Sequence, residues 1–127
     1  MEKKIIRTES APAPIGPYSQ ATLFGNLLFI SGQIPLDPGT GELVKESIGA
    51  ETRQVMENLK AILSEAGMGF GDALKTTIFI MDMGQFAAVN EVYGSYFSEN
   101  PPARETVQVA GLPKGVNVEI SMVAGRK

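Results

Sequence analysis

Apolar residues recur every three or four positions in two segments of the chain, and this spacing predicts two amphipathic helices. The first spans about residues 50–66, with Gly67 as the expected residue beyond its C-terminus. Its apolar stripe consists of Val55, Met56, Leu59, Ile62, Leu63 and Ala66. The second follows residues 82–85, which have the spacing of a capping box. Its apolar stripe consists of Phe86, Val89, Val92, Tyr93, Tyr96 and Phe97.

Shorter apolar or alternating segments predict the strands. They lie at residues 3–8, 21–24, 27–31, 74–81, 105–109 and about 117–124. Gly25 and Asn26 predict a hairpin turn between the second and third strands, and two segments rich in proline or glycine, 10–20 and 33–43, predict loops. The resulting order, with one helix on each side of the fourth strand, predicts a single α+β domain with both helices on one face of a sheet.

The strands at 27–31 and 74–81 carry apolar residues on both faces, although two helices can cover only one face of the sheet. The other face therefore needs a second cover. Another subunit is the expected one. The alternative is that the loops at 10–20 and 33–45 fold over this face.

Composition excludes several kinds of chemistry. The chain has 127 residues, which favours one domain, and it contains neither cysteine nor histidine. A Ser-His-Asp triad, a thiolate nucleophile and a metal site built on cysteine or histidine are therefore impossible. The net charge of −3 and the absence of a basic block disfavour a nucleic-acid partner. Without a signal-peptide pattern or an apolar run of 18 residues, a soluble, cytoplasmic protein is expected.

Two charged residues near the end of the chain are candidates for a site. In the strand at 105–109 the alternation places Arg104 on the face opposite Val107, and in the strand at 117–124 it places Glu119 opposite Ile120. If the apolar residues face the helices, Arg104 and Glu119 both project onto the other face, the expected subunit boundary. There they could form an ion pair or a solvated rim, or they could line a cleft in which the arginine binds a carboxylate.

Five segments of the sequence together resemble one known family. They are SAPAPIGPYSQA, LLFISGQIPLDPGTGEL, RQVMENLKAILSEAG, LKTTIFIMDMGQFAAVNEVYGSYF and PARETVQVAGLPKGVNVEISMVA, and they cover nearly the whole chain. The chain resembles the Rid (YjgF-type) family, and within it the RidA-like enamine/imine deaminases. The resemblance implies a mixed sheet in a single chorismate-mutase-like domain over residues 1–127. It also implies a homotrimer, assembled through the face without helices, with a ligand cleft at each subunit interface.

The resemblance also implies an activity. RidA-like members hydrolyse 2-aminoacrylate, 2-iminopropanoate and 2-iminobutanoate, which pyridoxal-phosphate dehydratases release, to 2-oxo acids and ammonia without a cofactor or a metal. Carried over by position, Arg104 would bind the substrate carboxylate, Glu119 would position water or manage its proton, and Tyr18 would contribute a hydroxyl. Further pocket positions, expected to bind substrate, are Ser31, Gly32, Asn90 and Thr106.

Simpler interpretations of these positions stay open. Tyr18 could serve packing alone, Ser31 and Gly32 could mark only a strand end, and Asn90 could be an exposed helix residue. The chain also departs from the family pattern, because Thr106 stands where a cysteine is frequent and Pro101 where an aromatic residue is common. Two other functions remain alternatives: a non-catalytic protein that binds small carboxylates, and a ribonuclease or translation-linked activity.

Overall fold

The computed structural model describes residues 2–127, and its elements follow the expected order. The strands are β1 (Lys3–Ile6), β2 (Ala21–Phe24), β3 (Leu27–Gln33), β4 (Ala73–Ile80), β5 (Ala103–Gln108) and β6 (Val118–Gly125). The helices are α1 (Ile48–Glu65) and α2 (Phe86–Gly94), with short 3-10 turns η1 (Phe70–Asp72), η2 (Met83–Gln85) and η3 (Pro113–Gly115). Each predicted strand and helix is present within a few residues of its expected bounds.

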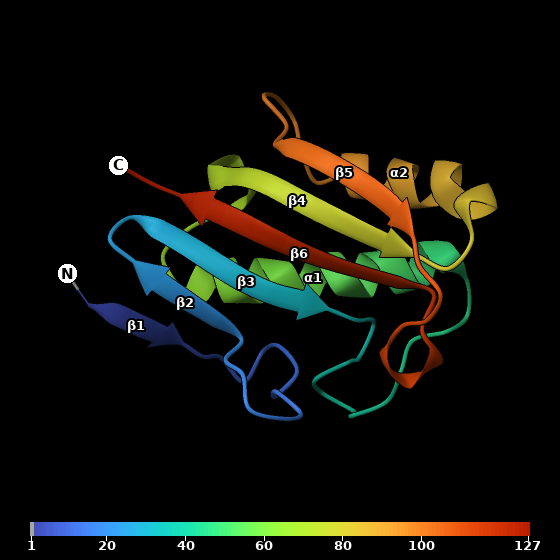
Figure 1. Ribbon diagram of the computed structural model, residues 1–127, viewed down its shortest axis with the longest axis horizontal. Helices are drawn as coiled ribbons and strands as arrows, with labels where there is room; N and C mark the ends of the chain where they lie inside the picture. The colour runs from blue at the N-terminus through green and yellow to red at the C-terminus, as the bar shows by residue number, and fades with distance from the viewer. Residues whose placement is uncertain (1) are drawn as a thin grey trace.

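The six strands form one mixed sheet in the order β1-β2-β3-β6-β4-β5. Only β4 and β5 run parallel among the paired strands, and α2 forms the crossover between them. The last strand, β6, inserts between β3 and β4 and pairs antiparallel with both. Figure 1 shows both helices on the same side of the sheet, with α1 behind β3 and β6 and α2 behind β5. The predicted α+β class with two helices on one face is therefore confirmed.

Helix α1 begins at Ile48, slightly earlier than its apolar stripe indicates, because Ser47 caps it. The Ser47 side chain accepts a hydrogen bond from the Ala50 amide at 3.0 Å. After the helix, Gly67 adopts a φ of +75°, as expected of the residue that ends a helix in the left-handed region. The predicted stripe is almost completely removed from solvent and forms the centre of the core.

The start of α2 differs from the prediction. Asp82 does not form a capping box with Gln85; its side chain accepts a hydrogen bond from the Gly84 amide at 2.8 Å inside the turn η2. The helix then begins at Phe86 and ends at Gly94, so the last two residues of the predicted stripe lie beyond it. These residues, Tyr96 and Phe97, still pack against the core, where both rings contact Phe70.

The two faces of the sheet differ sharply in exposure. The face towards the helices carries the buried side chains of Leu28, Ile30, Ile78, Ile80, Val118, Ile120 and Met122. On the opposite face, here called the open face, apolar side chains remain 40–53% exposed, among them Ile5, Phe24, Leu27, Phe29 and Val107. The loops therefore do not fold over these strands, and the alternative in which they do so is wrong. An uncovered apolar face of this kind is typical of a protein interface.

Candidate functional site

Arg104 and Glu119 lie on opposite faces of the sheet. In the register of β4 with β5, Arg104 is level with Thr76, which is buried on the helix face. In the register of β4 with β6, Glu119 is level with Phe79 on the open face. The expectation that both residues project onto one face is therefore wrong. It rested on Val107 facing the core, but β5 is an edge strand whose valine lies on the open face, while Arg104, Thr106 and Gln108 lie on the helix face.

The side chain of Arg104 is held by uncharged groups of α2. One guanidinium nitrogen, Nη1, donates a hydrogen bond of 2.7 Å to Oδ1 of Asn90. The guanidinium carbon lies 5.4 Å from the ring centroid of Phe86 and 5.1 Å from that of Tyr93. Both distances fall within the range of cation–π attraction. Within residues 2–127, no carboxylate forms a salt bridge with Arg104, so its charge is exposed and uncompensated.

Thr106 lies two residues further along β5 on the same face. Its hydroxyl oxygen is buried and has no hydrogen-bond partner among the described residues. A buried polar atom without a partner is costly and is usually satisfied by a ligand or water. The next residue on this face, Gln108, already accepts a hydrogen bond from the Met83 amide. We call Phe86, Asn90, Tyr93, Arg104 and Thr106 the Arg104 cluster.

A second group of predicted residues surrounds Glu119. Its carboxyl is half-buried, and this burial raises its pKa above the ordinary value of 4.5. Gly32, at the end of β3, lies directly against the carboxylate: a Cβ at this position would overlap Oε2 of Glu119. The glycine is therefore required for close approach rather than for an unusual backbone conformation, and it leaves room for the acid.

Ser31 and Tyr18 belong to the same region. The Ser31 hydroxyl donates to the Ser19 carbonyl at 2.6 Å, which fixes the strand to the preceding loop. Tyr18 is 51% exposed, and its hydroxyl accepts a hydrogen bond of 3.3 Å from the Ile15 amide. Tyr18 and Gly32 also line one small cavity of about 30 Å³. We call Tyr18, Ser31, Gly32 and Glu119 the Glu119 cluster.

Two buried polar residues that sequence reasoning missed support the Glu119 cluster. The amide of Gln20 donates to the carbonyls of Thr8, Ala11 and Pro12, which shapes the loop before Tyr18. Glu51 of α1, 1% exposed, accepts hydrogen bonds from the backbone amide of Asn117 at 3.0 Å and from its side chain at 2.7 Å. This contact fixes the start of β6 two residues before Glu119.

Phe86 and Tyr93 were also missed as partners of Arg104, because both fit the apolar stripe of a core helix. The available signal was their position relative to Asn90, four residues before and three residues after it, which places all three on one side of a helix. That spacing predicts that the three residues are neighbours on the helix, but it does not predict which strand they pack against.

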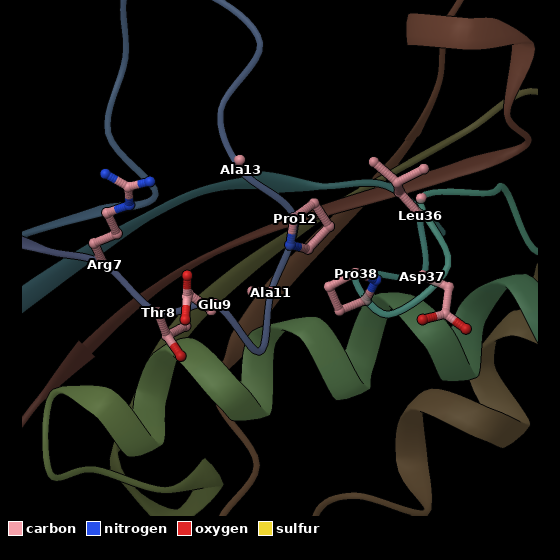
Figure 2. Close-up of a pocket in the computed structure, with 10 residues that line it drawn as sticks. Arg7, Thr8, Glu9, Ala11, Pro12, Ala13, Leu36, Asp37 and Pro38 are labelled. Atoms are coloured by element: carbon pink, nitrogen blue, oxygen red, sulfur yellow. The ribbon is translucent and has the colours of Figure 1, made fainter.

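A larger cavity lies away from the predicted residues. This cavity of about 420 Å³ lies between the segment after β1 and the turn after β3, with Arg7 and Asp37 on opposite sides of it (Figure 2). None of the predicted site residues lines it. Among residues 2–127, no group of three or more acidic side chains could hold a metal ion. No helix of the described chain is both long and apolar enough to cross a membrane.

Comparison with known proteins adds what geometry cannot. A RutC family protein of Pyrococcus horikoshii is 57% identical, over 96% of this chain and 97% of the relative. The 2-iminobutanoate/2-iminopropanoate deaminase of Salmonella typhimurium is 49% identical, over 98% of each chain. The crystal structure of E. coli TdcF with bound serine superposes with a TM-score of 0.94 at 46% identity, covering 98% of this chain and 99% of TdcF.

These similarities extend over almost the full length of the relatives, and the superposition confirms the expected fold. Residues 8–125 match the family described as Endoribonuclease L-PSP, a range that contains both clusters. The motifs, the fold and the relatives thus agree: the chain belongs to the endoribonuclease L-PSP family, which is the Rid (YjgF-type) family that its sequence resembles.

Proposed function

We propose that this protein hydrolyses small 2-imino acids and their enamine tautomers, namely 2-aminoacrylate, 2-iminopropanoate and 2-iminobutanoate, to 2-oxo acids and ammonia. The observation that carries the proposal is the exposed guanidinium of Arg104, held by neutral groups with no carboxylate partner. An arginine in this state is suited to a two-pronged contact with a substrate carboxylate. The deaminase name of the Salmonella relative and the serine bound to TdcF support a small amino-acid-like ligand.

The reaction needs little from the protein. The enamine takes up a proton at C3 and becomes the imine, whose C2 is already electrophilic. Water adds to C2, a proton passes to nitrogen, and the C–N bond breaks, with ammonia as leaving group and the 2-oxo acid as product. No strong nucleophile is required, so a chain without cysteine or histidine can perform it. Positioning of the reactants alone can lower such a barrier by up to about 7–11 kcal/mol.

The two clusters supply complementary roles. Asn90 uses one of the five N–H donors of Arg104, which leaves the others for the substrate carboxylate. Beside it, Thr106 offers a buried hydroxyl that has no hydrogen-bond partner among residues 2–127. Glu119, whose pKa burial raises, is suited to hold the attacking water and to move its proton. Tyr18 adds an exposed phenol hydroxyl, while Ser31 and Gly32 form the wall.

One chain alone does not bring these roles together, because the two clusters lie on opposite faces of the sheet. We therefore propose that the cleft forms between copies, with the Arg104 cluster of one and the Glu119 cluster of the next. The open face, with apolar side chains that are 40–53% exposed, is the proposed contact surface. The homotrimer implied by the family resemblance is an arrangement that would repeat this contact around a closed ring.

The family description also names an endoribonuclease, which is the alternative activity. Two features do not favour it. The net charge is −3, and the chain has no histidine to serve as general base for cleavage of RNA. A small-carboxylate ligand is the better match to one uncompensated arginine.

The proposal is tested by coupling the protein to a pyridoxal-phosphate-dependent serine or threonine dehydratase, the class of enzyme that would supply its substrate. The imine is released in situ, and 2-oxo acid is measured against competing trapping of the imine by semicarbazide. We expect faster 2-oxo acid release with the wild type and loss of the acceleration with Arg104→Ala. Binding of 2-oxobutanoate without acceleration would instead indicate a non-catalytic carboxylate-binding protein. RNA cleavage without imine hydrolysis would favour the ribonuclease.

A further inference from the structure

We propose that Phe86 and Tyr93 are positioning residues that clamp Arg104 in its ligand-binding orientation before any ligand arrives. This inference rests on the proposed function, because it assigns to Arg104 the contact with the substrate carboxylate. It goes beyond that function by giving two aromatic side chains, otherwise typical of a helix core, a role in affinity. The two rings and Asn90 contact the guanidinium from the same helix.

The clamp follows from how α2 and β5 face each other. Phe86, Asn90 and Tyr93 are spaced by four and three residues, so they lie on one side of α2. The guanidinium lies 5.4 and 5.1 Å from the two ring centroids, while the Asn90 oxygen accepts a hydrogen bond of 2.7 Å. A long arginine side chain is thereby restricted at three points, although its residue is exposed.

The Tyr93 ring is itself fixed. Its hydroxyl and that of Thr76 are hydrogen-bonded at 2.7 Å in the buried core. Thr76 lies directly beside Arg104 in the register of β4 and β5. Tyr93 therefore contacts Arg104 on β5 through its ring and Thr76 on the neighbouring strand β4 through its hydroxyl. Burial raises the pKa of Tyr93, so its ring stays a neutral phenol at ordinary pH.

The chemical nature of the clamp explains why it suits a carboxylate site. A carboxylate partner would hold Arg104 equally well, but it would neutralise the charge and compete with the substrate. Aromatic faces and an amide oxygen hold the side chain and leave a full positive charge directed outwards. An arginine that is ordered in advance loses less conformational entropy when it binds its ligand.

The test separates a missing ring from a damaged core. Phe86→Leu and Tyr93→Leu each remove one aromatic face. Tyr93→Phe keeps the ring and removes only the hydroxyl bonded to Thr76. Tyr96→Leu is the matched control, because Tyr96 packs against Phe70 and bonds Glu57 rather than Arg104. Dissociation constants for 2-oxobutanoate, KM and kcat for the imine, and thermal unfolding are measured for each variant.

We expect each leucine variant at the clamp to raise KM and the dissociation constant about two- to fivefold with kcat nearly unchanged, the size of one cation–π contact. Tyr93→Phe should keep the KM of the wild type, because the ring remains, while it lowers the unfolding temperature. Tyr96→Leu should lower the unfolding temperature with KM unchanged. Unchanged KM and affinity in both clamp variants would overturn the clamp, as would an equal rise in KM for Tyr96→Leu.

A second measurement does not depend on any ligand. With selectively ¹⁵N-labelled arginine, the Nε–H resonance of Arg104 should be shifted upfield by the ring currents of Phe86 and Tyr93, and each leucine variant should move it towards the random-coil position. If the wild type shows this shift but neither binds 2-oxobutanoate nor hydrolyses imine, the proposed function fails and the clamp stands. If the wild type is active but its Arg104 resonance has a random-coil shift, the clamp fails and the proposed function stands.

Discussion

Arg104 and Glu119 lie on two faces of one sheet: Arg104 is level with Thr76 beneath α2, and Glu119 is level with Phe79 on the open face. Strand β4 pairs with both of their strands, and the two partners on it, Thr76 and Phe79, are three residues apart. Because side chains alternate along a strand, this odd spacing places Arg104 and Glu119 on opposite faces. The backbone of the sheet separates side chains on its two faces, so one small molecule does not contact both residues of a single chain. If both serve one reaction, each active cleft must draw them from different copies.

This separation predicts complementation between inactive variants. Arg104→Ala and Glu119→Gln should each be inactive alone, whereas a mixture unfolded and refolded together should regain activity. In a ring of copies mixed at equal ratio, about a quarter of the clefts receive an intact half-site from each side. Imine hydrolysis is measured before and after joint refolding, with each variant refolded alone as the control. Recovery no greater than that of the controls would mean that one chain supplies both residues.

The open face should hold the assembly together. Phe29 is 45% exposed in the single chain, although it lies in the middle of the sheet on β3. Phe29→Glu places a charge on this face, and we expect dissociation to a 13.6 kDa monomer because the desolvation of an unpaired charge opposes contact. The helix-face core is untouched, so the circular dichroism spectrum should be unchanged. Light scattering after gel filtration gives the mass, with Lys45→Glu, an exposed residue in the loop before α1, as control.

The sequence predicts the elements and their order well because periodicity reports which residues share a face. It does not report which of two faces is buried, and β5 illustrates the difference. Its alternation correctly separates Arg104 and Thr106 from Val107, but the valine faces outwards. The usual rule that apolar residues face the core failed there because an edge strand can carry its apolar side chains towards a partner. The pairing register of β4 with β5, which the sequence does not give, was needed to place Arg104 on the helix face.

The same limit applies to the site. The family motifs name Gly32, Glu119, Asn90 and Arg104 as positions of one pocket without pairing them. The structure shows that Gly32 lies against Glu119 and that Asn90 accepts a hydrogen bond from Arg104. Glu51 could not be predicted, because its partner Asn117 is 66 residues away and nothing local marks the pair. Long-range hydrogen bonds of this kind depend on packing that no short motif encodes.

Glu51 provides a prediction about stability. Glu51→Ala leaves the backbone amide and the side chain of Asn117 without their acceptor at the buried start of β6. We expect the free energy of unfolding to fall by about 1–3 kcal/mol, the usual cost of orphaned buried donors. Chemical denaturation measures it, with Glu65→Ala at the exposed end of α1 as control. A loss no larger than that of the control would show that the Glu51 contact contributes nothing.

Gly32→Ala should affect catalysis more than ligand affinity. The added Cβ overlaps the Glu119 carboxylate, which must move, while the Arg104 cluster is untouched. A displacement of this order can lower kcat by about 10- to 100-fold, because a water held by Glu119 loses its alignment. Kinetics and 2-oxobutanoate binding are compared with Gly69→Ala, where a Cβ meets no atom within 4 Å. A normal kcat in Gly32→Ala would exclude Glu119 from the chemical step.

Glu119 also gives a pH-dependent prediction whose sign follows from its burial. Desolvation raises the pKa of the folded carboxyl above 4.5. Between the unfolded and the folded pKa, the folded chain therefore binds more protons than the unfolded chain. Stability therefore falls as Glu119 ionises, and it is fully retained only below the unfolded pKa. Glu119→Gln cannot ionise, so it should unfold at a higher temperature than its parent at pH 7 and at the same temperature at pH 4.

The comparison is best made in an Arg104→Ala background, since the proposed cleft would bring the cation of another copy towards Glu119 and lower its pKa. Thermal unfolding of Arg104→Ala and of Arg104→Ala/Glu119→Gln is followed at pH 4, 5.5 and 7. If the glutamine variant gained unfolding temperature over its parent as the pH fell, the burial argument would be contradicted, because that trend requires a depressed pKa of Glu119. An advantage at pH 7 that is smaller when Arg104 is present would place that arginine beside Glu119. Since Arg104 and Glu119 of one chain are on opposite faces of the sheet, the charge would have to come from another copy.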